Sequence, residues 1–472
     1  MSSTISALNS LLSNSSSAYD LSSILEAALG ATSPGIDVNQ AVSASLSAAE
    51  APEQQWETQE SILQSQESAL TQIQTGASNL DTDMQSLNSV TGPLAATTVT
   101  SSNSSVVTAT SASGSASGNN VVIVKSLATN DSWSSSTLAS ASTTVPAGSF
   151  TITPGDGDAT TITTDGTQTL SDLASQINGD SLGLSANVIT DSSGSRLSIV
   201  SNTSGSASDF TVTTSGYTGF GFTEVEAGAD ASLTVNGNQI SSASNTVTGV
   251  VPGLTLNLLG TSSSPVTLSV APDTSQASTA IERFVSDYNT LISAVNTQFS
   301  YTDGVGEGVL SDDPTVRTLQ SDLLQSIDYT YTPASGTTTM PNLSSMGITM
   351  NSDGTLSVDS ATLDNALKNN YSDVQQFFQG ASLNGFANSM DQQLTSFTSP
   401  GDGAFTVDLQ SMSSEYTSLQ SDIANFQTNV IEPLQTRLQA QYSQAEVALQ
   451  QLPIEMRNVD AELGINSGAS NG

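Results

Sequence analysis

Few residues of this chain could carry acid–base or nucleophilic chemistry. The sequence contains no His and no Cys, so it lacks the commonest general base and any thiolate nucleophile or thiolate metal ligand. Lys occurs only at Lys125 and Lys368, and neither belongs to a Ser-x-x-Lys motif. The carboxylates Asp156 and Asp158 lie in a Gly-rich segment with the composition of a turn, and their spacing is not that of a calcium-binding loop. We therefore predict no catalytic residue, no cofactor and no metal site, and expect a protein that is not an enzyme.

The charge of the chain argues against two further classes of partner. Seven Lys and Arg stand against 44 Asp and Glu, which gives a net charge of −37 and an isoelectric point near 4.1. Such a surface repels phosphate backbones and anionic lipid headgroups, so we expect no nucleic-acid partner. No segment approaches the roughly 20 apolar residues that span a bilayer, so we expect no membrane insertion. The charge favours solubility, and it would equally keep an unfolded chain from aggregating during export.

The first residues indicate how the protein leaves the cell. The segment 1–32 has neither a basic start nor a long apolar stretch, so it does not resemble a Sec signal. The richness in Ser, Thr, Gly and Asn and the lack of Cys are nevertheless typical of extracellular proteins. We therefore expect export through a dedicated channel. Residues 1–34 are predicted to form a flexible Ser-rich leader and residues 466–472 a flexible tail.

The structural elements that dominate the two ends are helices with an apolar seam. A seven-residue repeat predicts a helical stalk over 35–96, with a coiled coil at about 53–90 that ends at Thr91-Gly92-Pro93. Pro52 favours a separate short segment over 38–51, and Gln59 and Gln66 dilute the middle of the seam. The predicted seam residues of this N-terminal stalk are Trp56, Leu63, Leu70, Ile73, Leu80, Met84 and Leu87.

A second seam predicts a C-terminal coiled-coil stalk over 405–465. Its steps of four and three residues give way to steps of four near Leu434, which is typical of a stutter in a coiled coil. Pro433 lies inside that stretch and Pro453 follows it, so we expect two kinks or breaks. The predicted seam residues are Leu409, Met412, Tyr416, Leu419, Ile423, Phe426, Val430, Leu434, Leu438, Leu449, Leu452, Met456, Val459 and Leu463.

Two interpretations of these seams remain open. The simpler one is that 53–90 and 405–430 pack on one another within one chain. The more terminal parts have no obvious partner of sufficient length in the same chain, and an apolar stripe without a partner marks an assembly surface.

Between the stalks the hydrophobic period changes to two. Short Val/Ile/Thr runs with intervening turn residues predict antiparallel strands over 97–272, with one short helix at Leu170–Ile177. We expect two β head domains: residues 97–128 with 225–272 form the first, and 129–224 form the second. Residues 273–404 are predicted to form a leg domain of helices with a β insert, whose hairpin turn is Asn351–Gly354. The fold class is therefore multidomain α+β, with β heads inserted between helical terminal stalks. The predicted strands include Val121–Val124, Phe150–Thr153, Arg196–Val200, Phe210–Thr213, Leu233–Val235, Leu254–Leu258 and Val266–Val270.

Several segments resemble one known family. Gly35–Val38 followed by Ser47–Pro52 resembles the N-terminal region of flagellar cap proteins, also called hook-associated protein 2. The segment Leu170–Asn178, with Leu184–Val188 after it, is similar to the insert motif that flagellins and hook-associated proteins share. The resemblance covers about residues 35 to 463. Its most specific part is an ordered series of short motifs: Leu233–Gly237, Ser244–Thr248, Val251–Leu256, Val270, Asp273–Thr274 and Phe284–Asn289.

The resemblance implies a structural role at the tip of the bacterial flagellum. It implies a ring-like homo-oligomer whose helical stalks enter the filament end, while the β heads retain exported flagellin and promote its folding and polymerisation. The implied partners are further copies of the chain, flagellin, the filament end, the flagellar export apparatus and an export chaperone. Alternatives are another flagellar axial protein, either a flagellin or a hook–filament junction protein, or a β-rich surface adhesin.

Overall fold

The computed structural model describes residues 37–155, 157–301, 306–333 and 336–462, and the chain divides into two compact units. The first unit is formed by Met1–Asn79, Thr290–Leu323 and Gln393–Gly472, and the second by Leu80–Asn289 and Leu324–Gln392. The predicted leader and tail lie outside the described residues.

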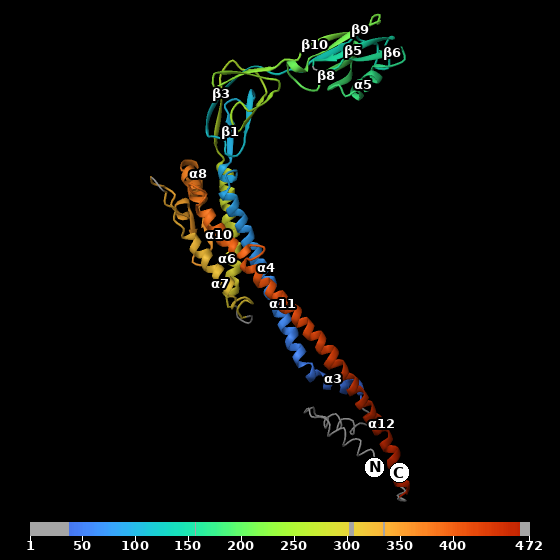
Figure 1. The fold of residues 1–472 in the computed structure, drawn as a ribbon, viewed down its shortest axis with the longest axis vertical. Helices are drawn as coiled ribbons and strands as arrows, with labels where there is room; N and C mark the ends of the chain where they lie inside the picture. The colour runs from blue at the N-terminus through green and yellow to red at the C-terminus, as the bar shows by residue number, and fades with distance from the viewer. Residues whose placement is uncertain (1–36, 156, 302–305, 334–335, 463–472) are drawn as a thin grey trace, which may run out of the picture. The chain divides into compact units, whose positions relative to one another are not determined.

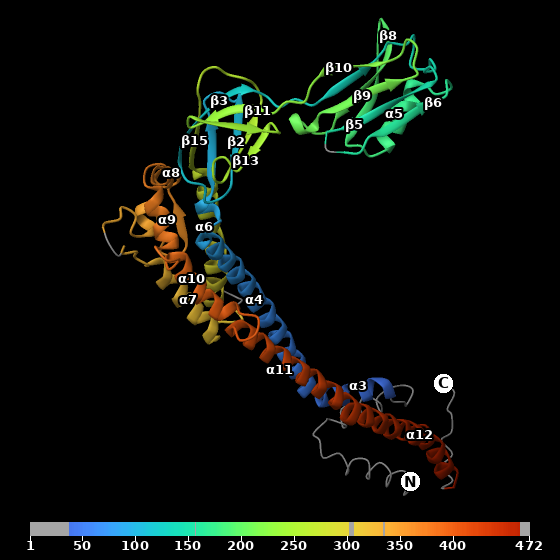
Figure 2. The ribbon, with the colours of Figure 1, turned by 45° about the horizontal axis from the view of Figure 1, so that its top comes forward.

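Helices lie at both ends of the described chain and antiparallel strands fill much of its middle (Figures 1 and 2). The predicted fold class is thereby confirmed. The α-helices are α3 (Val38–Ala49), α4 (Ala51–Asn88), α5 (Leu170–Gly179), α6 (Thr274–Phe299), α7 (Pro314–Ile327), α8 (Ser360–Asn369), α9 (Tyr371–Gln379), α10 (Phe386–Thr398), α11 (Ala404–Phe426) and α12 (Glu432–Glu462). Shorter helical turns are η1 (Pro93–Ala95), η2 (Ser206–Ser208), η3 (Leu343–Met346) and the π-helical η4 (Gln427–Ile431).

The strands of the second unit form several sheets, and every pairing described between them is antiparallel. The predicted strands all fall within observed ones. The strands are β1 (Thr97–Ser101), β2 (Val107–Ser111), β3 (Gly118–Ser126), β4 (Ser132–Ser135), β5 (Gly148–Pro154), β6 (Thr160–Thr164), β7 (Leu184–Asp191), β8 (Gly194–Ser201), β9 (Phe210–Ser215), β10 (Phe222–Glu226), β11 (Ala231–Val235), β12 (Asn238–Ser242), β13 (Thr246–Thr248), β14 (Leu254–Leu258), β15 (Val266–Pro272), β16 (Ile348–Met350) and β17 (Leu356–Val358).

One β core is built by strands from two separate stretches of sequence. A five-stranded sheet, in the order β1-β15-β3-β11-β12, and a three-stranded sheet, β13-β14-β2, supply its side chains. Strands β11, β14 and β15 alternate buried and half-buried positions, because successive side chains point to opposite faces of a sheet. The β11–β12 hairpin turns at Asn236-Gly237, where both residues have positive φ, as a type I′ turn requires.

A second core lies between these two stretches in sequence. It joins the four-stranded sheet β10-β4-β8-β7, the three-stranded sheet β6-β5-β9 and helix α5. Thr169 and Asp172 form a capping box that begins α5, and Leu170, Leu173 and Ile177 are buried on one helix face. The two cores are consistent with two heads, while the predicted boundaries at residues 129 and 224 stay a prediction.

The inserted β region is closed where the chain enters and leaves it. Strand β1 pairs with β15 from Thr97 opposite Pro272 to Ser101 opposite Leu268. Immediately after this ladder, the Asp273 N–H donates to the Ala96 carbonyl at 2.9 Å. The Asp273 carboxylate then caps α6 by accepting from the N–H groups of Ser275 and Gln276. One ladder therefore joins the end of the β region to the start of a long helix.

The helices around α6 in the second unit enclose an aromatic cluster. Phe377 and Phe386 stack with their ring centroids 5.2 Å apart, and Phe284 of α6 meets Phe386 edge-on at 5.6 Å. Pro314 is the first residue of α7, a position where its missing N–H leaves no helix hydrogen bond unmade. The predicted hairpin at Asn351–Gly354 is also confirmed, since β16 and β17 pair on either side of it.

We expected kinks or breaks at Pro433 and Pro453, and the structure contains no break at either residue. The chain remains helical from Ala404 to Glu462, and Pro453 lies inside α12. The irregularity is instead the π-helical turn Gln427–Ile431, which directly precedes Glu432 and Pro433. A proline near a turn in which the hydrogen-bond pattern already changes removes one donor but does not end the helix.

An excised fragment of residues 97–272 is expected to unfold cooperatively on heating, because both β cores and the β1–β15 ladder lie within it. A matched fragment of residues 102–272 lacks β1 and leaves β15 without that ladder, so its thermal midpoint should be lower. Circular dichroism against temperature measures both. The absence of a cooperative transition in the longer fragment, or equal midpoints, would contradict this account of closure.

Candidate assembly surface

The predicted N-terminal seam lies on one face of α4. Trp56 is half-buried, and the side chains from Leu63 onward are buried, with Leu70 and Leu80 fully inaccessible to solvent. Ile73, Met84 and Leu87 are buried in the same way. The amphipathic face therefore becomes better covered towards the C-terminal end of α4.

Helix α11 runs antiparallel to α4 in the first unit. Gln59 of α4 donates to Glu415 at 3.1 Å, and Gln64 donates to the Tyr416 hydroxyl at 3.0 Å. Nearer the start of α4, the Gln427 amide beyond α11 donates to the carboxylate of Glu53. Residue numbers thus rise along α4 as they fall along α11. The interpretation that 53–90 and 405–430 pair within one chain agrees with these contacts.

Much of this helix pair is joined by polar groups. Gln420 donates both to Glu60 at 3.1 Å and to the Tyr416 hydroxyl at 2.8 Å. The edge-to-face contact of Trp56 with Phe426, at 5.3 Å between ring centroids, is the aromatic contribution. Exposed hydrogen bonds of this kind contribute about 0.5–1.5 kcal/mol each. Polar contacts of this kind therefore contribute to the pair beside the apolar seam residues that α4 buries.

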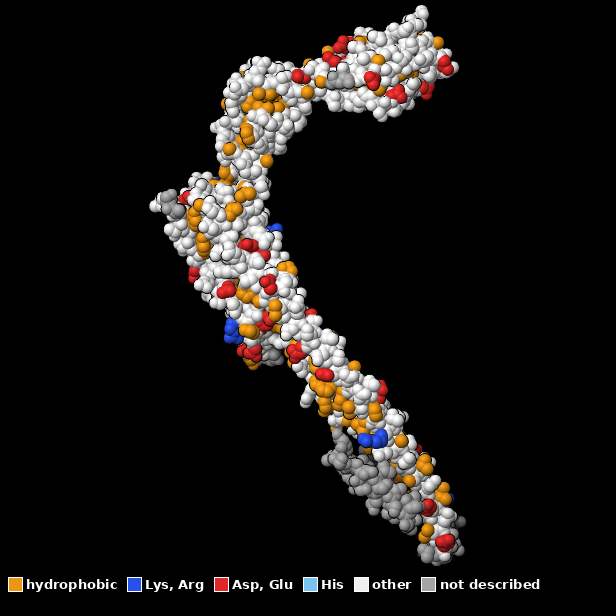
Figure 3. All heavy atoms as spheres, in the orientation of Figure 1, with side chains coloured by type: hydrophobic (Ala, Val, Ile, Leu, Met, Phe, Trp, Pro, Cys, Tyr) orange, Lys and Arg blue, Asp and Glu red, His pale blue; other side chains and the backbone are white. Residues whose placement is uncertain are grey.

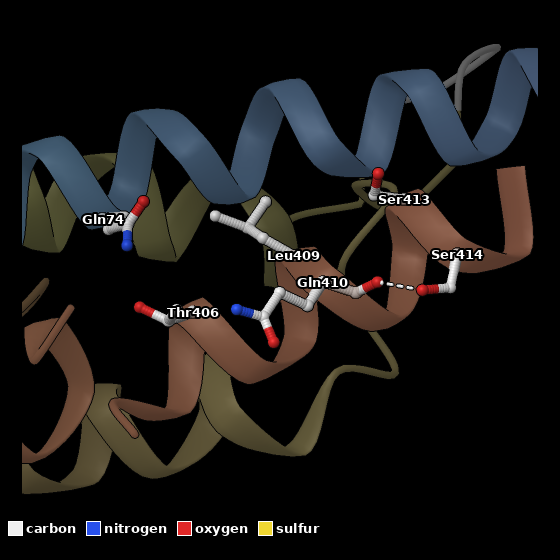
Figure 4. Close-up of a pocket in the computed structure, with 6 residues that line it drawn as sticks. All are labelled: Gln74, Thr406, Leu409, Gln410, Ser413 and Ser414. Atoms are coloured by element: carbon white, nitrogen blue, oxygen red, sulfur yellow. Dashed lines mark hydrogen bonds between the residues drawn. The ribbon is translucent and has the colours of Figure 1, made fainter. Parts of the chain in front are cut away.

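The predicted seam of α11 is only partly covered within this chain. Leu419 is buried, whereas the other predicted positions before the π turn are half-buried: Leu409, Met412, Tyr416, Ile423 and Phe426. A groove of about 470 Å³ lies along this face, lined by Gln74 of α4 and by Thr406, Leu409, Gln410, Ser413 and Ser414 of α11. Figure 4 shows Leu409 lying between the two helices, with hydroxyl and amide groups around it.

Val430 does not occupy the seam position that its spacing predicted. Its side chain is 44% exposed, while the next residue, Ile431, is 4% exposed. Both lie in the π turn, which inserts one residue per turn and so moves the buried position from i+4 to i+5 after Phe426. The sequence indicates that the buried positions shift near this point, because steps of four residues mark a stutter in a coiled coil. It does not tell which residue is buried after the stutter.

The expectation that the terminal seam has no partner within the chain is also wrong in part. Helix α3 packs on α12, and Ala41, Val42 and Leu46 form one core with Ile431, Tyr442, Ala445 and Leu449. Leu434, Leu438 and Leu452 pack against this core and are half-buried. The Ser45 hydroxyl and the Tyr442 hydroxyl are hydrogen-bonded at 2.8 Å. The short segment before Pro52 therefore covers the part of the C-terminal stalk that α4 does not reach.

Other parts of the C-terminal helices keep apolar side chains in solvent. Val407 of α11 and Val447 and Ile454 of α12 are each more than half exposed. Figure 3 shows apolar side chains along this helical region, among scattered acidic ones. Val459 is half-buried, and the Met456 side chain and Leu463 lie outside the described part of the structure. An assembly role for the two seams stays a prediction.

The described residues contain no group of three or more acidic side chains placed to hold a metal ion. Within the same part of the chain, no helix combines the length and hydropathy that crossing a membrane requires. The candidate functional surfaces of the described residues are therefore helix faces and sheets.

Three family models match the chain. One, for the N-terminus of flagellar hook-associated protein 2, matches residues 34–131, and another, for the C-terminus of the same protein, matches residues 228–453. The model of the flagellin hook IN motif matches residues 149–203, which include α5 and strands β7 and β8.

Relatives that carry the name of the same family are similar to this chain in sequence. The B-type flagellar hook-associated protein 2 of Pseudomonas aeruginosa is 31% identical over 186 residues, which are 37% of each chain. Flagellar hook-associated protein 2 of Escherichia coli O157:H7 is 29% identical over 236 residues, covering 48% of this chain and 50% of the relative. These alignments thus span half of the relatives' length or less. The crystal structure of the D1-D2-D3 domains of the flagellar cap protein FliD from Escherichia coli matches with a TM-score of 0.56 at 28% identity, over 73% of this chain and 99% of that one.

Replacing Leu449 by Ala should release α3 from α12. Helix α3 has 12 residues, and isolated helices shorter than about 12–15 residues are marginal in water. Removal of a buried Leu side chain costs about 2–5 kcal/mol, so the contact should open far more often. Hydrogen exchange of α3 peptides, measured by mass spectrometry, should become faster.

The matched control is Val447→Ala, two residues away on the exposed side of the same helix. It should leave exchange in α3 unchanged. Equal exchange in the wild-type protein and Leu449→Ala would show that α3 does not depend on this contact.

Proposed function

This chain belongs to the flagellar hook-associated protein 2 family, and on that premise we propose that it is the structural cap at the distal end of the bacterial flagellar filament. In this role it retains exported flagellin and promotes its folding and polymerisation at the growing tip. It acts through shape and assembly rather than catalysis.

The observation that carries the proposal is the arrangement of helical ends around an inserted β region. The similarity to the cap protein from Escherichia coli extends over almost the whole of that crystal structure. The family matches lie on both sides of the insert motif, so they include the helix α4 as well as the closing strands β11 to β15. A flagellin or a junction protein would share the insert motif, but these flanking matches favour the cap.

We further propose a ring-like homo-oligomer in which the helical seams contact neighbouring copies or the filament end. The half-buried face of α11 and the exposed Val407, Val447 and Ile454 support this, because apolar surface that stays in solvent is available for assembly. The polar contacts between α4 and α11 suit an assembly that must rearrange as each flagellin subunit is added. Secretion through the flagellar export channel, with an export chaperone, completes the proposal.

Deletion of the gene in its source bacterium tests the proposed function. The expected phenotype is loss of filaments with flagellin released into the medium, and restoration of filaments when the gene is supplied on a plasmid. Filaments of normal number and length in the deletion strain would exclude a cap.

Removal of residues 431–472 in the plasmid copy should abolish this restoration, because it deletes α12 and the residues that α3 packs on. Thermal unfolding of the β heads should stay nearly unchanged, since no residue of either β core is removed. The control variant lacks only 466–472 and should restore filaments. Normal filaments with the longer deletion would show that the C-terminal stalk is not the anchor.

A further inference from the structure

A half-buried acidic contact joins α4 to α10 in the second unit. Asp81 of α4 faces Asp391 of α10, and the two carboxyl groups lie close enough to hydrogen-bond. The Asp81 Oδ2 accepts from the Gln85 amide at 3.2 Å. The Oδ1 atoms of both Asp81 and Asp391 are buried and accept no hydrogen bond. Two carboxylates in contact repel each other, and buried oxygens without a donor are costly, so this arrangement calls for a proton between them.

The neighbouring Asp83 has a different environment. It is 5% exposed, and its Oδ1 lies 2.9 Å from Nε of Arg283 on α6, which is also 3.8 Å from Asp287. The charged groups that face this part of α4 are therefore Arg283 and Asp287 from α6 and Asp391 from α10. Arg283 offsets the charge of Asp83, whereas no cation faces Asp81 among them.

We propose that Asp81 and Asp391 form a proton-operated latch between α4 and α10, closed when the Asp81 carboxyl group holds a proton that it donates to Asp391, and weakened when Asp81 loses that proton. The closed state binds one proton from solvent and releases it on opening. No other reactant is needed. The latch does not depend on the proposed capping role.

The direction of the pH response follows from burial. Burial first, and then Asp391, raise the pKa of Asp81 from its ordinary 3.8 to about 7. The folded protein therefore holds a proton that the unfolded chain releases between these values. The stabilisation is complete below about pH 4 and is lost as the pH rises through about 7. Burial also raises the pKa of Asp83 to about 6, with Asp287 raising it and Arg283 lowering it, so Asp83 acts in the same direction at lower pH.

Hydrogen exchange of α10 peptides in the full chain, corrected for the intrinsic effect of pH, measures the opening of the latch. In the wild-type protein the opening constant should rise by up to about tenfold per pH unit between about pH 4 and about pH 7, because opening then releases the proton of Asp81, and it should level off above about pH 7. In Asp391→Asn the opening constant should rise by less than about threefold per pH unit, because the amide of the new side chain can donate a hydrogen bond to Asp81 at every pH.

Asp81→Asn is a second variant with the same expected result, so a folding defect in one variant does not decide the outcome. Asp364→Asn is the matched control, since Asp364 is an exposed residue of α8 paired with Lys368, and the rise with pH should persist. A wild-type opening constant that does not change with pH would overturn the latch. So would an unchanged rise in both Asp81→Asn and Asp391→Asn.

Discussion

The antiparallel ladder between β1 and β15 is the interaction on which the rest of the structure depends. It joins the strand that opens the inserted β region to the strand that closes it, and Asp273 then starts α6 directly from that ladder. Closing so long an insertion costs chain entropy, although this cost grows only slowly with loop length. Because the ladder holds both ends of the insertion together, the heads can vary without separating the helices that precede and follow them.

The helical ends of the chain use two different kinds of contact. The contact of α3 with α12 is an apolar core around Leu46 and Leu449, closed by the Ser45–Tyr442 hydrogen bond. The contact of α4 with α11 includes polar groups on both helices, with Gln420 bonded to Glu60 of α4 and with Gln59 and Gln64 of α4 bonded to α11. The first resists opening because it buries side chains, whereas the second exchanges its partners with water at little cost. The proposed cap, which rearranges as each flagellin subunit is added, would use both properties.

The sequence predicted the elements well and their partners less well. Periodicity located the strands, α5 and the long helices, because one face of each is buried against a core. It misplaced Val430 by one residue, since the π turn changes the phase and only the three-dimensional structure shows which residue is then buried. Two contacts join residues that lie more than 300 positions apart in the sequence: the packing of α3 on α12 and the contact of Asp81 with Asp391. No local pattern in the sequence predicts such pairs. Pro453 shows that a strong local preference can be overridden within a long helix.

The proposed cap sits at the growing end of the filament, and its position there can be measured directly. The turn between β7 and β8, at Ser192 and Ser193, is exposed to solvent. We expect a short epitope tag inserted there to leave the fold intact, because neither side chain is buried. Immunogold electron microscopy of intact cells carrying the tagged protein should label the distal ends of filaments and nothing else along them. Label along the filament shaft would indicate a flagellin, and label at the base would indicate a junction protein; either result would contradict the account.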